Sequence, residues 1–507
     1  MLKSEIIEKT GRLLMVGFHG TEPDDHLRKM IEEFRVGGVI LFRRNVVNAG
    51  QVADLTEEIQ DIARKAGYET PLIISIDQEG GMVNRIKDGM ALSPGNMAIG
   101  ATGDGETARE IGEITGRELA GIGINMNLAP VLDLARSPSN HLGPRCFGED
   151  PELVGLMGRE YSRGQSAFGV SPVGKHFLGY GGSEIDPHID LPRNDLEREQ
   201  LEDSLKPFEI ARDSLEGLMT AHIVLNSIDE TPATLSEKVI QGLIREKLGF
   251  TGTVITDCLE MGAIQDRFGT EEGAVRAVRS GADLLIVSHH QREQISAIRS
   301  LRKALTDERL KGESVEKSWE RINRLSSTKS WKSGRNYSLE EDRRRTEEIA
   351  GHAITALSSE GMPLREGENV LLITPKLSGR PFSPVQDKEI RLLSIKSDLK
   401  EAGVEATELV YDGDLPDFGQ LESSVSNSEK VVLLALEASN DVRNLAKFVK
   451  GKDTKVILVG LHNPWGFNGM PVDSLLLTYG YSRSSLRGLA NVLLGRVSPD
   501  STPPVTL

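Results

Sequence analysis

The stretch LIISID, residues 72–77, is a short apolar run that ends on an aspartate, and it is one of eight such apolar runs in the first 290 residues. The other seven are LLMVGF (13–18), GGVILF (37–42), NMNLAPVLDL (125–134), SPVGKHF (171–177), GLMTAH (217–222), TVITD (253–257) and ADLLIV (282–287). Segments with a helical mixture of polar and apolar residues separate them. Near-continuous Val/Ile/Leu runs that alternate with helices indicate a parallel sheet covered on both faces. Eight such units predict a (β/α)8 TIM-type barrel.

The residues able to do chemistry lie at the C-terminal ends of these runs or just after them: Asp77, Asp133, Lys175, His176, His222, Asp257 and His289. Active sites of barrel enzymes occupy that rim. A doubly wound sheet would gather ligands only near its switch points, not around all of its strands. The distribution therefore favours the barrel.

A chain of 507 residues is too long for one ordinary core, and its pattern changes after the eighth run. A charged, helical segment is followed by new strand-like runs: NVLLITP, ATELVY, KVVLLAL, KVILVGL and SLLLTYG. These runs alternate with helices and predict a smaller α/β sandwich domain. We expect a catalytic barrel over 1–325, a linker and helix over 326–359, and the C-terminal α/β sandwich over 360–507.

Composition narrows the class of protein. The hydrophobic share of 38% and the charged share of 27% fit a soluble globular protein, and the net charge of −16 argues against a nucleic-acid partner. No apolar stretch has the length of a membrane span, and the N-terminal residues lack the apolar core of a signal peptide. Cys146 and Cys258 cannot form a disulfide framework, so we expect a cytoplasmic protein. The sequence does not predict the oligomeric state.

Residues 175–188 read KHFLGYGGSEIDPH and place Asp186 and His188 two residues apart on a glycine-rich loop. An imidazole beside a carboxylate is a proton carrier, and a separate carboxylate, Asp257, follows about 70 residues later. Two-step glycosyl transfer requires such a proton donor and a nucleophilic carboxylate. Taken singly, Asp186 and His188 could be turn residues, and Asp257 could cap the next helix.

Other candidates have weaker signals. His176 and His222 could be satisfied core histidines, and the two cysteines are typical of buried thiols. The adjacent His289 and His290 would point in opposite directions on a strand, and no metal-ligand spacing occurs. We expect neither a metal nor an organic cofactor.

Five runs would lie together on the barrel rim: IDQEGGMVNR (76–85), RCFGEDP (145–151), KHFLGYGGSEIDPH (175–188), AHIVLNSIDETPATLS (221–236) and LIREKLGFTGTVITDCLEMGAI (243–264). In this order they resemble glycoside hydrolase family 3, and within it the β-N-acetylglucosaminidases of the peptidoglycan-recycling type. The resemblance extends from about residue 10 to residue 330. Its most specific feature is the D-x-H motif, which the β-glucosidases of the family lack.

The resemblance implies a role for each matching residue. Asp257 falls on the family nucleophile, and His188 falls on the acid/base, with Asp186 orienting its ring. The positions that hold the sugar's hydroxyls in the −1 subsite are Asp77, Arg85, Arg145, Lys175 and His176, and His222 matches a supporting position in the pocket wall. Cations near Asp257 should keep it ionised and lower its pKa.

The chain departs from the K-H-F-P-G-H-G pattern of the subgroup. Leu178 and Tyr180 replace the Pro and the second His, Gly182 replaces an Asp or Arg, and Pro187 stiffens the dyad. These changes leave the nucleophile and the dyad intact and leave the aglycone and N-acyl preference open.

The resemblance implies a retaining exo-β-N-acetylglucosaminidase that releases terminal GlcNAc from muropeptide or chitin-derived fragments. A β-N-acetylglucosaminide phosphorylase, which passes the sugar to phosphate, fits the same residues. A family 3 β-glucosidase or β-xylosidase is disfavoured by the D-x-H motif. A non-catalytic sugar-binding protein is disfavoured because Asp257, Asp186 and His188 are all retained.

Overall fold

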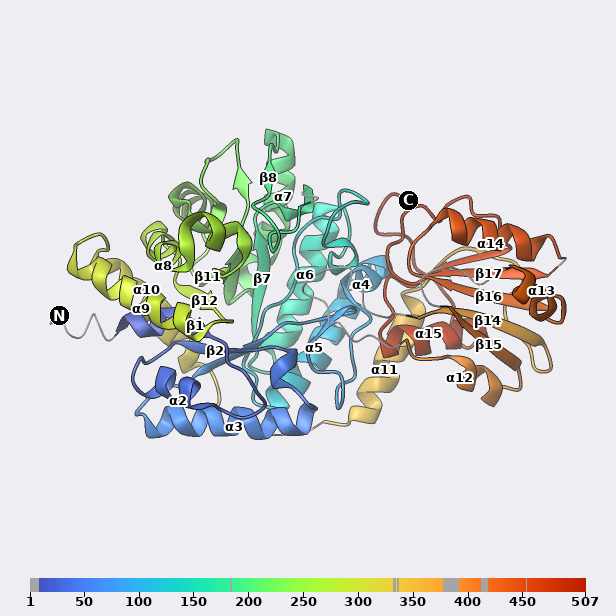
Figure 1. Ribbon diagram of the computed structural model, residues 1–507, viewed down its shortest axis with the longest axis horizontal. Helices are drawn as coiled ribbons and strands as arrows, with labels where there is room; N and C mark the ends of the chain where they lie inside the picture. Colours follow the sequence, from blue (N-terminus) through green and yellow to red (C-terminus); the bar gives the residue numbers. More distant parts are fainter. Residues whose placement is uncertain are drawn as a thin grey trace.

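The computed structural model describes residues 9–182, 185–331, 334, 337–376, 392–411, 418–452 and 454–507. Its N-terminal part is a closed barrel of eight parallel strands in the order β1-β12-β11-β9-β7-β6-β3-β2 (Figure 1). The strands are β1 (Leu14–Val16), β2 (Gly38–Leu41), β3 (Ile73–Ile76), β6 (Met126–Asn127), β7 (Ser171–Phe177), β9 (Gly217–Thr220), β11 (Thr253–Cys258) and β12 (Leu284–Val287). Each lies within one of the eight predicted runs or extends it by one residue, and the predicted barrel is confirmed.

The barrel closes because its first strand pairs with both its second and its last strand. Met15 of β1 is in register with Gly38 of β2, and Leu14 is in register with Leu285 of β12. All residues of β1, β2, β3 and β12 are buried, since the barrel interior fills one face and helices cover the other.

Helices surround the barrel: α2 (Asp25–Glu32), α3 (Ala49–Lys65), α4 (Asn96–Thr102), α5 (Gly105–Gly121), α6 (Pro151–Ser166), α7 (Arg198–Ala211), α8 (Gly262–Ser280), α9 (Gln291–Thr306) and α10 (Gly312–Ser327). A π-helical segment, Lys238–Lys247, takes the place of a helix between β9 and β11. Local sequence explains where several helices begin. Asp150 caps α6 by accepting a hydrogen bond from Leu153 N, and Pro151 follows at the first helical position, which needs no N–H donor.

The second part is a six-stranded sheet in the order β13-β18-β17-β16-β14-β15. Its strands are β13 (Thr355–Ser359), β14 (Asn369–Pro375), β15 (Glu405–Tyr411), β16 (Lys430–Ala435), β17 (Lys455–Gly460) and β18 (Ser474–Leu477). All pair in parallel except β13, which runs antiparallel to β18. Two pairs of helices flank the sheet: α12 (Lys396–Glu401) with α15 (Arg483–Leu493), and α13 (Phe418–Ser426) with α14 (Asn440–Lys450) (Figure 1). The predicted α/β sandwich is confirmed.

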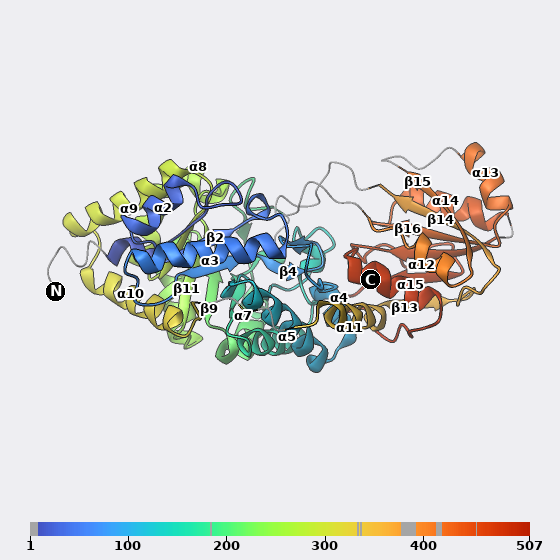
Figure 2. The same cartoon turned by 90° about the horizontal axis from the view of Figure 1, so that it is seen from below.

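The two parts lie side by side, and α11 (Leu339–His352) packs between α4 and α5 of the barrel and α15 of the sandwich (Figure 2). Arg117 of α5 forms an ion pair with Asp342 of α11. The predicted linker segment 326–359 holds α11 and also β13, an edge strand whose sequence, TALSS, gives little apolar signal. The predicted domain boundaries stay a prediction.

Short strands and single-turn helices complete the described part of the barrel. Two small sheets pair β4 (Gln78–Gly80) with β5 (Val83–Asn84), and β8 (Arg193–Asn194) with β10 (Val224–Leu225). The single-turn 3-10 helices are Thr10–Leu13, Arg43–Asn45, Gly143–Arg145, Tyr180–Gly182, Arg212–Ser214 and Ala233–Leu235.

Candidate active site

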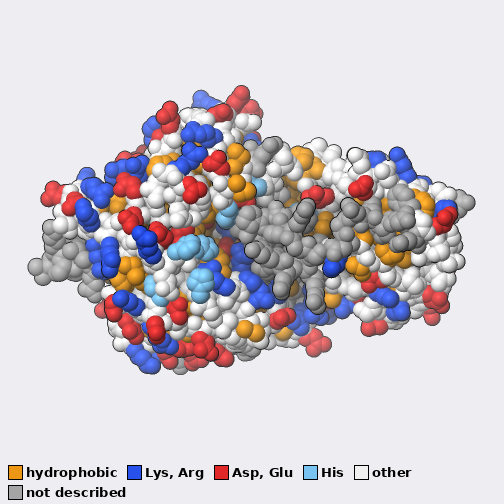
Figure 3. Space-filling view, viewed as in Figure 1, with side chains coloured by type: hydrophobic (Ala, Val, Ile, Leu, Met, Phe, Trp, Pro, Cys, Tyr) orange, Lys and Arg blue, Asp and Glu red, His pale blue; other side chains and the backbone are white. Residues whose placement is uncertain are grey.

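A pocket of about 700 Å³, including its open mouth, lies at the C-terminal rim of the barrel. Its described lining is Ile40, Phe42, Asp77, Arg85, Leu128, His141, Leu142, Arg145, Lys175, His176, Tyr180, Asp186, Pro187, His188, Met219, Asp257, Cys258, Met261, Ile286 and His289. The structure thus brings together every predicted site residue except His222. On the face shown in Figure 3, several histidine side chains gather on the barrel with Lys and Arg side chains beside them.

Asp257 lies near the end of β11, where its carboxylate is partly exposed and lines the pocket. Its Oδ1 accepts a hydrogen bond of 2.7 Å from the backbone N–H of Cys258. Burial raises the pKa of Asp257, but His222, His176, His188 and that N–H lower it by more, so the pKa lies below its ordinary value. Asp257 is therefore an ionised carboxylate at neutral pH, with its other oxygen bonded to no described residue.

The Asp186–His188 pair lies on the loop after β7. Asp186 Oδ1 is 2.7 Å from His188 Nδ1 and also accepts the His188 backbone N–H at 2.9 Å. Burial raises the pKa of Asp186, but its hydrogen bonds to His188 lower it by more, which keeps the carboxylate charged. Because Nδ1 is engaged by Asp186, Nε2 is the ring nitrogen left for proton exchange.

The dyad loop is anchored to the segment that follows the nucleophile strand. Pro187 O accepts a hydrogen bond of 3.2 Å from Ala263 N, in the first turn of α8. Only four residues lie between Asp257 and Gly262, where α8 begins. This contact ties the dyad loop to the segment after Asp257, and both His188 and Asp257 line the pocket.

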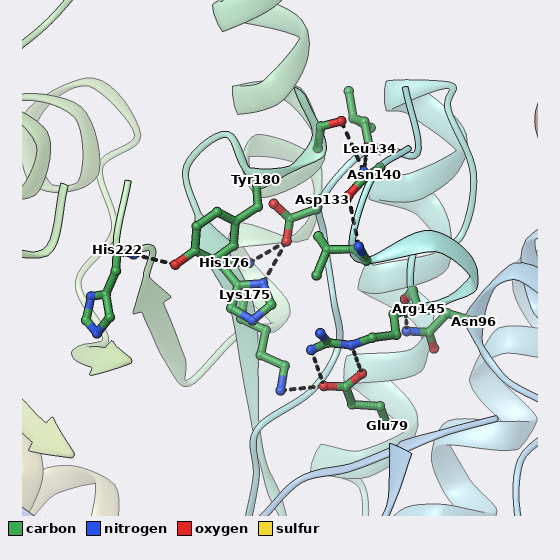
Figure 4. Close-up of polar contacts among 12 residues, drawn as sticks. Glu79, Asn96, Asp133, Leu134, Asn140, Arg145, Lys175, His176, Tyr180 and His222 are labelled. Carbon is green, nitrogen blue, oxygen red and sulfur yellow. Dashed lines mark hydrogen bonds and ion pairs between the residues drawn. The ribbon is translucent and has the colours of Figure 1, made fainter. Parts of the chain in front are cut away.

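A buried ionic network forms another wall of the pocket (Figure 4). Lys175 Nζ lies 2.7 Å from both Asp77 Oδ1 and Glu79 Oε1. Glu79 also binds Arg145 through two parallel contacts, Nη2–Oε1 at 2.8 Å and Nε–Oε2 at 2.9 Å. Arg85 Nη2 lies 3.7 Å from Asp77 Oδ2. The network fixes its cations beside the pocket, where their N–H groups can donate to a polar ligand.

The opposite charges of this network keep one another ionised. Burial raises the pKa of Glu79, but Arg145 and Lys175 lower it by more, to well below the ordinary value. The pKa values of Lys175 and Arg145 are raised in turn, although burial alone would lower them. The pKa of Asp257 is lowered as expected, but the groups that lower it most are three histidines and a backbone N–H rather than lysine and arginine.

His176 is held from behind by a carboxylate. Asp133 Oδ2 accepts the His176 backbone N–H at 2.9 Å and lies 2.8 Å from its Nδ1. The Tyr180 ring lies 5.0 Å from the His176 ring, centroid to centroid. His176 therefore presents its Nε2 side with a fixed orientation.

His222 lies behind the pocket wall and is fully buried. Its backbone N–H donates to Tyr180 Oη at 2.6 Å, Nδ1 lies 2.8 Å from Thr234 Oγ1, and Nε2 lies 2.9 Å from Cys258 O. Burial lowers its pKa, so the ring is neutral at pH 7. With both ring nitrogens bonded to protein groups, His222 supports Tyr180 and the Asp257–Cys258 backbone, and its predicted contribution to the site is indirect.

Sequence reasoning gave no role to Glu79, Tyr180 or His141, and it named Asp133 only as a residue able to do chemistry, without a specific role. Asp133 was recognisable as a strand-end acid, and Glu79 lies within the IDQEGG run beside Asp77. Tyr180 stood out only as a departure from the family pattern. His141 lies in a long loop with no periodic signal, and only the fold brings it to the pocket.

Among the described residues, no group of three or more His, Cys, Asp or Glu side chains is arranged to hold a metal ion. Within the same parts of the chain, no helix has the length and apolarity needed to cross a membrane.

Comparison with known proteins places this site in a family. The model of the glycosyl hydrolase family 3 N-terminal domain matches residues 5–325. A beta-hexosaminidase A from Pseudoalteromonas piscicida is 35% identical over 385 residues, which are 69% of this chain and 64% of that protein. The chain thus spans less than two thirds of the length of this relative. A beta-hexosaminidase from Alkalilimnicola ehrlichii is 35% identical over 325 residues, 62% of this chain and 92% of that protein.

Solved structures agree. A glycoside hydrolase family 3 beta-N-acetylglucosaminidase from Paenibacillus sp. str. FPU-7 is 37% identical, with a TM-score of 0.91 over 100% of this chain and 99% of that chain. The beta-glucoside phosphorylase BglX is 21% identical with a TM-score of 0.79, a likeness of fold alone.

The rim of the closed barrel carries an ionised carboxylate, an Asp–His dyad able to carry a proton, and several Lys and Arg side chains. This arrangement is typical of a glycoside hydrolase. The family model matches more than half of this chain, and the chain therefore belongs to glycosyl hydrolase family 3.

Proposed function

We propose that this chain is a retaining exo-β-N-acetylglucosaminidase in which Asp257 is the nucleophile and His188 the acid/base. The observation that carries the proposal is the 2.7 Å contact between His188 Nδ1 and Asp186 Oδ1, in the same pocket as the ionised Asp257. The hexosaminidase names of its relatives support the choice of sugar.

In the first step, the free oxygen of Asp257 attacks the anomeric carbon as the glycosidic C–O bond breaks. The imidazolium of His188 gives its Nε2 proton to the departing oxygen, while its Nδ1–H stays bonded to Asp186. The aglycone leaves as an alcohol, and the sugar remains as an ester on Asp257. His188 is then neutral, with Nε2 ready to accept a proton.

In the second step, water attacks the anomeric carbon and gives a proton to His188 Nε2. The bond to Asp257 breaks, the carboxylate returns, and the β-configured sugar is released. Two inversions at one carbon give net retention. Asp77, Arg85, Arg145, Lys175 and His176 hold the sugar's hydroxyls throughout, and no step needs a metal or organic cofactor.

The form of the site supports release from a chain end. The rim site is a pocket, and Lys175 and Arg145, held by the buried Glu79 behind them, form part of its wall. A pocket of this kind accepts one terminal sugar with the aglycone directed outward, as a muropeptide or chitin-derived fragment would require. The cytoplasmic location expected from the sequence remains part of this proposal.

The test is turnover of aryl β-N-acetylglucosaminide beside aryl β-glucoside, each with and without phosphate. We expect release of GlcNAc that is independent of phosphate, at least about a thousandfold slower in Asp257→Ala. Asp213→Ala is the matched control, because Asp213 is an exposed partner of Arg212 on the barrel surface. Turnover of the glucoside alone would refute the sugar assignment.

A β-N-acetylglucosaminide phosphorylase, which transfers the sugar to phosphate, is the second candidate, and the histidine dyad is the observation that favours it. A neutral imidazole repels an anionic acceptor less than a carboxylate base would. Acceleration by phosphate, with N-acetylglucosamine 1-phosphate as product, would establish phosphorolysis with the same two catalytic groups.

A further inference from the structure

One long loop of the barrel brings three residues to the pocket. Residues 135–149, here called the pocket loop, connect the end of β6 with α6 and carry His141, Leu142 and Arg145 to the pocket lining. His141 lies edge-on to the Tyr180 ring, with 5.4 Å between the ring centroids, and adds to the larger effect of His188 in lowering the pKa of Asp186. The position of this loop therefore bears on both the sugar contacts and the dyad.

Hydrogen bonds join the two ends of the pocket loop to each other and join the loop to neighbouring parts of the barrel domain. Ala135 N donates to Gly148 O at 2.8 Å, which joins the two ends of the loop. Asn140 Nδ2 donates to Gly181 O at 3.1 Å, and Asn96 Nδ2 donates to Arg145 O at 2.7 Å. These bonds fix the inner side of the loop, and its outer side is covered by another part of the chain.

Residues 501–507, which follow the sandwich domain, lie against the base of the pocket loop. Pro504 O accepts the Glu149 backbone N–H at 3.0 Å, and Thr506 Oγ1 donates to Glu149 Oε1 at 2.6 Å. Val505 is only 4% exposed and belongs to the main hydrophobic core. The fit is close at Gly148, where a Cβ would lie 2.7 Å from Pro504 O.

The sandwich domain also reaches the tip of the pocket loop. Asn463 lies between β17 and β18 of the sandwich, and its Nδ2 donates to Pro138 O at 3.4 Å. The pocket loop is thus contacted at both its tip and its base by residues beyond 460. None of these residues is in the described pocket lining, and their contacts with the loop give them an indirect connection to the site.

We propose that segment 501–507, with Asn463, positions the pocket loop and thereby sets the affinity of the pocket for its sugar. Thr506, Val505 and Asn463 are positioning residues for Arg145 and His141, which reach the pocket directly. A loop held at its outer side keeps Arg145 in its bidentate contact with Glu79 before substrate arrives, so binding need not order it. The consequence for substrate rests on the proposed function, whereas the effect on the loop does not.

The test compares the full chain with a variant that ends at Asp500 and with Thr506→Val. Thr306→Val is the matched control, because Thr306 Oγ1 donates to Arg302 O on an exposed turn of α9. Three quantities are measured: hydrogen exchange of peptides that cover 135–149, KM and kcat for aryl β-N-acetylglucosaminide, and the thermal midpoint. Exchange is read in the free protein and needs no substrate.

We expect exchange in 135–149 to become at least about tenfold faster in the shortened chain, and less so in Thr506→Val, while β3 and α9 keep their protection. KM should rise about tenfold with a smaller change in kcat. Unchanged exchange in 135–149 would overturn the proposal, as would faster exchange throughout the barrel with an unchanged KM, which marks a purely structural role. Faster local exchange in a protein without activity on the glucosaminide would retain the loop assignment and refute the proposed function instead.

Discussion

Replacing Glu79 with glutamine is the sharpest test of the ionic network beside the pocket. Glu79 is 2% exposed and makes three charge-assisted contacts, two with Arg145 and one with Lys175, at 2.7–2.9 Å. Contacts of this kind contribute about 1.5–3 kcal/mol each, and removing one partner of a buried charge pair costs about 3–5 kcal/mol in all. Glutamine has nearly the same volume, so the loss is one of charge and not of packing.

We expect Glu79→Gln to lower the free energy of unfolding by about 3 kcal/mol at pH 7, because either orientation of the amide turns its NH2 group toward an N–H donor of Arg145 and the negative charge opposite Lys175 is lost. The assay is urea unfolding followed by fluorescence, at pH 7 and at pH 4. The folded pKa of Glu79 is below its unfolded value, so the stabilisation is present above the unfolded pKa and declines as the pH falls. The difference between the two proteins should therefore shrink at pH 4. A variant within 0.5 kcal/mol of the wild type at pH 7, as expected for a surface change, would refute this reasoning.

Three further outcomes follow from the same geometry. His188→Ala should lower kcat/KM about a hundredfold or more for poor leaving groups and much less for dinitrophenyl glycosides, and equal losses for both would exclude an acid role. Tyr180→Phe removes the acceptor of a buried N–H and should cost about 1–3 kcal/mol in urea unfolding, whereas an unchanged midpoint would show that the 2.6 Å bond contributes nothing. Burial raises the pKa of Glu118 to about 8, so the folded protein holds an extra proton between about pH 4.5 and pH 8, and wild-type stability falls as the pH rises through that window. Glu118→Gln should abolish this decline and be about 2 kcal/mol more stable at pH 8, and parallel stability profiles would contradict it.

Strand periodicity was sufficient to predict most of the fold. The eight barrel strands and four of the six sandwich strands are apolar runs of ordinary length, because a strand covered on both faces must be apolar throughout. β15, at one edge of the sandwich sheet, was predicted from the run ATELVY although only one of its seven residues is buried. β13 was missed since it lies at an edge, pairs on one side only and has three exposed residues among its five. Edge strands bury little, so their sequences carry little signal.

The site was predictable where chemistry coincides with a strand end. Asp77, Lys175, His176 and Asp257 follow from the parallel barrel, whose strands all end at one rim. Glu79 was not assigned, since a fully buried carboxylate differs from an exposed one only through the partners that the fold brings to it. His141 was not assigned for the same reason. The contact of residues 501–507 with the pocket loop was also missed, because it joins segments more than 300 residues apart.

The central claim is that Asp257 forms a covalent bond with the sugar, and the anomeric configuration of the first product tests it most directly. Proton NMR of an aryl β-N-acetylglucosaminide, recorded in the first minutes with a large amount of enzyme, separates the two anomers before they interconvert. The double displacement predicts that β-N-acetylglucosamine appears first and that the α anomer grows only by mutarotation. An α anomer formed first would mean a single displacement by water and would contradict the role of Asp257 as nucleophile.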